Sequence, residues 1–109
     1  MKKFCLALDL IDDPKLIAEY ENHHQNIWPE VRQSILDSGI IDMEIYRFQN
    51  RLFMIIEADD SFSFESKNDL DKNNPKVQEW EELMWKFQQQ LPNSNAGEKW
   101  RLMDRIFTL

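Results

Sequence analysis

Two polar aromatic side chains are spaced so that they could act together in acid–base chemistry. Tyr20 and His24 are four residues apart, and on a helix that spacing brings side chains to the same face, one turn apart. Histidine gains and loses a proton near neutral pH, so it can serve as a general acid and as a general base. His24 is therefore the candidate catalytic residue. His23 points about 100° away around the same helix and is expected to face solvent.

The same residues also have an ordinary structural interpretation. A histidine near the carboxyl end of a helix is favoured by the helix dipole without any catalytic role. Tyr20 and Trp80 lie on apolar helical stripes, where aromatic side chains usually belong to the core. Residue type and spacing alone therefore leave both interpretations open.

Several other kinds of chemistry find no support in the sequence. The two adjacent histidines, with a single cysteine in the chain and no HExxH pattern, do not predict a metal site. A serine nucleophile of the GxSxG type is absent. With only two glycines, the chain also has no glycine-rich loop that could hold a phosphate.

Length and composition predict one folded domain, residues 1–109. The chain is 42% hydrophobic and 12% aromatic, which is enough for a core in a domain of this size. Its formal net charge of −7 opposes binding to nucleic acids and to anionic membranes. Cys5 lies in an apolar run, so we expect a buried, unreactive thiol.

The sequence does not predict a membrane or secreted protein. It contains no apolar run of about 18 residues, and Asp9 interrupts the short apolar stretch near the start, where no cleavage site follows. A reducing, cytoplasmic location is consistent with the lone cysteine.

Hydrophobic periodicity and turn residues divide the chain into strands and helices. The predicted strands are Phe4–Ile11, 41–48, 52–58 and Trp100–Leu109. A helix broken before Pro29 is expected over 14–24 and 29–36, and a long helix from Pro75 whose apolar stripe reaches Leu91. We expect residues 59–74 to be mostly a connector, with room for one short helix.

This element order predicts an α+β fold of the ferredoxin-like type, an antiparallel sheet with helices on one face. The other face of the sheet would carry apolar side chains without a cover. A second copy of the chain is the simplest cover, so we expect a homodimer with a barrel-like assembly of the two sheets.

The stretch YENHHQNIWPE, from Tyr20 to Glu30, resembles the signature of the L-rhamnose mutarotase family. Further similarity covers essentially the whole chain and includes Ser38–Gly39, Ile45–Tyr46, Leu52–Phe53, Gln78–Trp80 and the final IFTL. The resemblance implies a ferredoxin-like dimer that interconverts the α and β anomers of a free deoxysugar without a cofactor.

Carried over residue by residue, the resemblance assigns roles to four side chains. It implies that His24 is the catalytic acid–base group and that Tyr20 contacts the sugar. Trp80 corresponds to the first of two adjacent tryptophans beside the sugar, and Trp28 of the signature stretch is expected to bind substrate as well. This chain departs from the family pattern at two positions, where Glu81 replaces the second tryptophan and Met43 replaces a sugar-contacting tyrosine.

Three hypotheses for the function follow. The first is a mutarotase of a 6-deoxyaldose monosaccharide, with L-rhamnose as the first choice of substrate and L-fucose as its rival. The second is a dimeric sugar-binding module without catalysis, suggested by Met43 and Glu81. The third is a different small enzyme of the same fold, such as a cofactor-free oxygenase.

Overall fold

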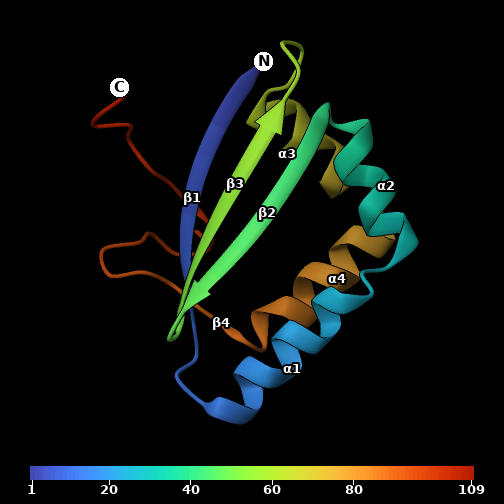
Figure 1. Ribbon diagram of the computed structural model, residues 1–109. Coiled ribbons are helices and arrows are strands. Elements are labelled where there is room, and N and C mark those ends of the chain that lie inside the picture. Colours follow the sequence, from blue (N-terminus) through green and yellow to red (C-terminus); the bar gives the residue numbers. More distant parts are fainter.

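An antiparallel sheet with helices packed on one face forms the frame of the protein, which a computed structural model describes over all residues from 1 to 109 (Figure 1). The strands are β1 (Lys2–Leu10), β2 (Ile40–Phe48), β3 (Arg51–Ala58), β4 (Gln88–Gln89) and β5 (Arg101–Leu102). The helices are α1 (Pro14–Gln25), α2 (Pro29–Asp37), α3 (Phe64–Lys72) and α4 (Pro75–Trp85). The predicted α+β class and antiparallel sheet are thus confirmed.

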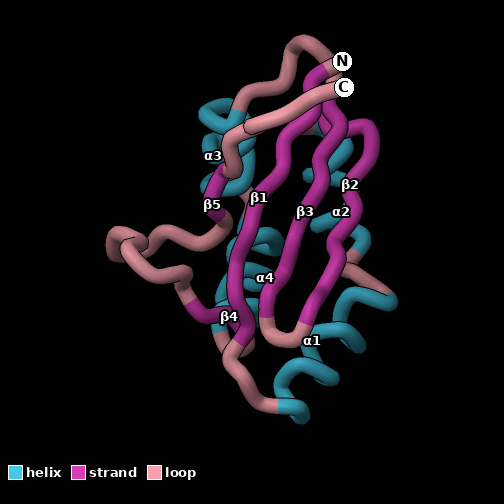
Figure 2. The backbone as a smooth tube through the Cα atoms, turned by 60° about the vertical axis from the view of Figure 1, so that its left-hand side comes forward, coloured by secondary structure: helices cyan, strands magenta, loops and turns pink.

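The strands are arranged in the order β2-β3-β1-β4, and β5 also pairs with β1. β2 and β3 form the predicted hairpin, and β3 pairs with nearly the full length of β1. β4 and β5 each pair with only two residues on the remaining edge of β1 (Figure 2). The central strand therefore has one fully paired edge and one sparsely paired edge.

Capping residues and prolines set the helix boundaries that position the site. The Asp13 carboxylate accepts hydrogen bonds from the backbone nitrogens of Lys15 and Leu16, at 2.9 and 3.2 Å, and Pro14 begins α1. Trp28 has an extended backbone (φ −61°, ψ 136°) because Pro29 disfavours a helical conformation in the residue before it. The break between α1 and α2 is therefore confirmed.

The two faces of the sheet differ in their cover. Alternate side chains facing the helices are buried in the core: Leu6, Leu10, Leu52, Met54, Ile56 and Ala58. The opposite face has no covering element within the chain, and Tyr46 and Phe48 are 53% and 76% exposed there. Cys5 lies on this face and is half-buried, so the expectation of a buried thiol was wrong.

The helix from Pro75 is shorter than its apolar stripe indicates. It ends at Trp85, and Gln88 and Gln89 form β4 instead of continuing toward Leu91. The backbone nitrogen of Ile11 donates to the carbonyl of Phe87 at 2.8 Å, so the chain leaves the helix to pair with the free edge of β1. Phe87 is buried as the stripe predicted, but it lies in the turn between helix and strand.

The predicted C-terminal strand is also mostly wrong for the single chain. Only Arg101 and Leu102 form strand pairs with β1 (Figure 2). The backbone nitrogen of Met103 still donates to the Cys5 carbonyl at 2.8 Å, and residues 104–109 have no assigned strand. Ile106 and Phe107 are 94% and 75% exposed. The alternation of apolar residues is present, but a strand needs a neighbouring edge, and this chain offers none beyond β5.

The segment before α4 contains more helix than expected. Residues 64–72 form α3, which Ser63 caps through a hydrogen bond from the backbone nitrogen of Ser66 at 3.1 Å. Phe62 is 2% exposed and packs with Phe4 and Phe64. None of the four helices has the length and apolar character needed to cross a membrane.

Candidate active site

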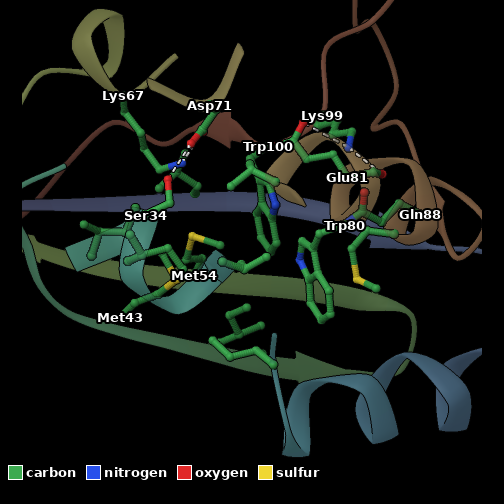
Figure 3. A pocket seen from close by; sticks show the side chains of 18 of the residues that line it. Ser34, Met43, Met54, Lys67, Asp71, Trp80, Glu81, Gln88, Lys99 and Trp100 are labelled. Carbon is green, nitrogen blue, oxygen red and sulfur yellow. Dashed lines mark hydrogen bonds and ion pairs between the residues drawn. The ribbon is translucent and has the colours of Figure 1, made fainter. Parts of the chain in front are cut away.

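A cavity of about 580 Å³ lies between the helices and the covered face of the sheet (Figure 3). Its walls come from α1, α2, α3 and α4, from all three long strands, and from the segment around β5. This volume is within the range of small-molecule sites, and most lining residues are apolar with a few polar groups among them.

His24 lines this cavity and has a hydrogen bond on only one of its two ring nitrogens. Its Nδ1 lies 2.9 Å from the carbonyl oxygen of Tyr20. Since a carbonyl oxygen only accepts hydrogen bonds, Nδ1 must be the protonated nitrogen, and Nε2 of the neutral ring is left as an acceptor. Burial lowers the pKa of His24, the hydrogen bond to Tyr20 offsets part of this, and His23 lowers the pKa further. The ring is therefore neutral at pH 7 and able to take up a proton.

Tyr20 lies directly against His24 in the same wall. The two ring centroids are 4.4 Å apart, and Tyr20 is only 3% exposed. Burial raises the pKa of Tyr20 to about 12, against a smaller opposing effect of a hydrogen bond from Gln88. The phenol therefore stays protonated at neutral pH and can donate a hydrogen bond.

The two predicted tryptophans have different positions. Trp80 lines the cavity, is 8% exposed, and packs edge-on against His24 with 5.5 Å between ring centroids. Trp28 packs against Trp80 at 5.3 Å but is not among the cavity-lining residues. The fold thus brings Tyr20, His24 and Trp80 together at the cavity, while Trp28 supports Trp80 from behind.

The expectation that His23 faces solvent was wrong. Its ring is half-buried and lies 5.5 Å from the ring of Phe87 and 6.4 Å from that of Trp80. The early end of α4 explains the difference, because the turn into β4 brings Phe87 against α1. His23 does not line the cavity.

Comparison with known proteins identifies the family. The sequence profile of the L-rhamnose mutarotases matches residues 3–109. The chain belongs to the L-rhamnose mutarotase family. Enzymes of this kind are isomerases that act on the anomers of sugars.

Two relatives of known name differ in the sugar. An L-fucose mutarotase from Xanthomonas campestris pv. campestris is 44% identical over 100% of this chain and 89% of its own length. An L-rhamnose mutarotase from Phocaeicola vulgatus is 31% identical over 72% of this chain and 73% of its own length.

Solved structures agree on the fold. The crystal structure of an L-rhamnose mutarotase from Formosa agariphila matches with a TM-score of 0.72 at 21% identity, covering 100% of this chain and 99% of that one. Tetracenomycin F2 cyclase from Streptomyces glaucescens matches with a TM-score of 0.59 at 16% identity, with the same coverage. At these identities the matches establish the architecture only.

Met43 from β2 and Glu81 from α4, the two residues expected from the sequence to depart from the family pattern, both line the cavity. The Nζ of Lys99 lies 3.2 Å from the carbonyl oxygen of Glu81 and 3.7 Å from its carboxylate. Burial lowers the pKa of Lys99, and the interaction with Glu81 opposes that change. A pair of oppositely charged side chains, Lys99 and Glu81, therefore forms part of the cavity wall.

Sequence reasoning missed a second polar group at the far end of the cavity. The carboxylate of Asp71 accepts hydrogen bonds from Lys67 at 2.6 Å and from Ser34 at 3.3 Å. Gln78 donates to the backbone carbonyl of Asp71 at 2.8 Å. No sequence signal could have linked Ser34 to this cluster, because it comes from α2, 37 residues away.

Gln88 was missed as well, because the apolar stripe placed it in a helix. It is 7% exposed, lines the cavity, and is part of a run of three glutamines whose members look alike in the sequence. No group of three or more His, Cys, Asp or Glu side chains is placed to hold a metal ion.

Proposed function

We propose that the protein is a mutarotase of 6-deoxy-L-hexoses that prefers L-fucose and uses His24 as its acid–base group. The observation that supports it most is the neutral His24 ring with an unbonded Nε2, because this residue lines a cavity of sugar size together with Tyr20 and Trp80. The sequence motifs ranked L-rhamnose first. The similarity to an L-fucose mutarotase over 100% of this chain supports L-fucose as the preferred sugar in this proposal.

One imidazole can move both protons of the reaction. His24 Nε2 takes the proton of the anomeric hydroxyl, the bond between C1 and the ring oxygen breaks, and an aldehyde forms at C1. The imidazolium then gives its proton to the former ring oxygen. Both oxygens are bonded to C1 in the closed sugar, so a single positioned group reaches them. Rotation about C1–C2 followed by the reverse steps gives the other anomer.

The neighbouring side chains suit the rest of a 6-deoxysugar. The protonated Tyr20 hydroxyl can donate to a sugar oxygen, and the indole of Trp80 provides an apolar surface for the side of the sugar that bears the methyl group. The positions that distinguish one deoxysugar from another are then the remaining polar contacts, which include the departure at Glu81.

Saturation-transfer NMR between the two anomeric protons tests the proposal, with L-fucose and L-rhamnose in separate samples. We expect the wild type to accelerate exchange, more for L-fucose, and His24→Ala to lose about 10²- to 10⁴-fold of the acceleration, because positioned acid–base catalysis contributes that much.

His23→Ala is the matched control, since it removes an adjacent half-buried histidine that does not line the cavity. It should keep activity within a few-fold, and circular dichroism should report a folded chain for both variants. Full acceleration by His24→Ala would remove this residue from the mechanism. A non-catalytic sugar-binding module or an oxygenase predicts no accelerated exchange by the wild type.

We also propose that a second copy covers the open face of the sheet. The exposed Tyr46 and Phe48 and the unpaired apolar residues Ile106 and Phe107 support this, since a single chain leaves them in water. Light scattering should give twice the mass of the chain, and a monomer at micromolar concentration would contradict the proposal. A cytoplasmic location stays a prediction.

A further inference from the structure

Gln88 carries an unusual polar atom. Its side-chain oxygen Oε1 is buried without a hydrogen-bond partner, and it is the only such side-chain atom in the protein. The residue is 7% exposed and lines the same cavity as Tyr20, His24 and Trp80. Buried acceptors are almost always paired, because an unpaired one loses its bonds to water without replacement. The atom therefore points to a donor that enters the cavity.

The backbone holds Gln88 in place. It pairs with Leu10 in the sheet, directly after Phe87, whose carbonyl accepts a bond from Ile11 at 2.8 Å. The two glutamines that follow have other surroundings. Gln89 is exposed, and Gln90 donates to the carbonyls of Asn95 and Glu98, both at 2.9 Å. Of these three identical residues, only Gln88 lines the cavity, and only its side-chain oxygen is both buried and without a partner.

Its neighbours make a hydroxyl group the fitting donor. A hydrogen bond from Gln88 partly offsets the raised pKa of the Tyr20 hydroxyl. The Tyr20 ring packs in a tilted arrangement against the ring of His24. Figure 3 shows the Gln88 side chain near Glu81, on the same side of the cavity as Trp80. A cationic donor is not required at this position, because the amide oxygen is neutral. A free sugar presents several neutral hydroxyl donors, which match such an acceptor.

We propose that Gln88 is a substrate-binding and specificity-determining residue, whose side-chain oxygen accepts a hydrogen bond from the hydroxyl on C2, C3 or C4 of the bound 6-deoxysugar. The inference rests on the proposed function and extends it to a residue outside the signature stretch. A site built to bond a hydroxyl rejects the analogue without it, because the buried oxygen is then left unpaired. With Gln88 in place, kcat/KM should therefore be higher for a sugar that has this hydroxyl than for one that lacks it.

The test pairs a variant with modified sugars. Gln88→Met keeps the length of the side chain and removes its polar atoms. Exchange rates are measured for L-fucose and for its 2-deoxy, 3-deoxy and 4-deoxy analogues with the wild type and the variant. We expect Gln88→Met to lower kcat/KM for L-fucose about tenfold to a hundredfold, and to lower it little for one of the three analogues, because that sugar lacks the bonded hydroxyl.

Gln89→Met is the matched control, since it makes the same change on the exposed neighbour, and it should leave all four rates unchanged. An equal loss on every sugar in Gln88→Met, or no loss at all, would overturn the proposal. The first result would mean that Gln88 only supports the fold, and the second that no hydroxyl binds it.

Sugar affinity is measured in parallel by NMR titration, which keeps the two proposals separate. If the wild type binds L-fucose without accelerating exchange, the proposed function fails, while the same comparison of dissociation constants still tests Gln88. If the wild type binds none of the four sugars, the inference about Gln88 fails as well.

Discussion

The two ends of the cavity use polar side chains in opposite ways. At the end near α3, Asp71 has hydrogen-bond partners on both carboxylate oxygens, from Lys67 and Ser34. At the end near α1 and β4, His24 leaves Nε2 free and Gln88 leaves Oε1 without a partner. In Figure 3, Trp100 lies between Asp71 on one side and Gln88 on the other.

Whether a polar atom has a hydrogen-bond partner within the protein distinguishes groups that stabilise the fold from groups that can still bond to a ligand. A carboxylate with a protein donor on each oxygen gains little from a ligand, whereas an unpaired buried acceptor gains when a ligand supplies a donor. Charge alone would have drawn attention to Asp71 and Lys67. The pairing of the atoms instead favours the neutral residues His24 and Gln88 as the site.

The largest effect we expect at the paired end is on stability. Asp71→Ala leaves the partly buried ammonium of Lys67 without its partner, so the free energy of unfolding should fall by about 2 to 3 kcal/mol. The kcat of the folded enzyme should change little. Denaturant unfolding and NMR exchange on the same samples measure both quantities.

Asp69→Ala is the control for this change, because Asp69 is an exposed residue on the same helix. This substitution should leave the free energy of unfolding almost unchanged. A large loss of kcat in stable Asp71→Ala would break the comparison, since it would show that the paired end also serves the reaction.

A smaller effect, on the pH dependence of the catalysed rate, is expected at the end of the cavity that contains His24. The folded pKa of His24 lies below its ordinary 6.5, so the neutral base persists as the pH falls through that value. We expect the catalysed rate to stay constant there and to drop about tenfold per pH unit only below the lowered pKa. NMR exchange rates, corrected for the uncatalysed reaction, measure this profile.

The free energy of unfolding should also decrease as the pH falls. Between the lowered pKa and 6.5 the unfolded chain binds more protons at His24 than the folded one, so this contribution to stability is present above pH 6.5 and is lost as the pH falls toward the folded pKa. The Asp71→Ala variant should give the same activity profile. A midpoint at or above pH 6.5 would argue against a buried, neutral His24 as the base.

Local signals in the sequence predicted much of the frame. Pro14, Pro29 and Pro75 begin helices as expected, and the alternation in residues 41–58 predicted the hairpin. Each of these features depends on nearby residues only, so the sequence contains the information directly.

Features that depend on distant partners could not be read in the same way. The apolar stripe after Pro75 correctly predicted that Phe87 is buried, but burial does not specify the backbone, and the free edge of β1 determines that residues 88–89 form a strand. For the site, the four-residue spacing of Tyr20 and His24 in the sequence correctly predicted that their side chains lie together. Gln88 reaches them only through that pairing with β1, which no local pattern indicates.

The short pairing of β4 also has a consequence for motion. Two residue pairs hold Gln88 to the edge of β1, while eight hold β3 to the other edge. Segments with few backbone bonds open locally at a lower free energy than the whole domain unfolds. The cavity wall that contains Gln88 therefore belongs, with β5, to the edge of the sheet that opens at a lower free energy than the hairpin and its pairing with β1.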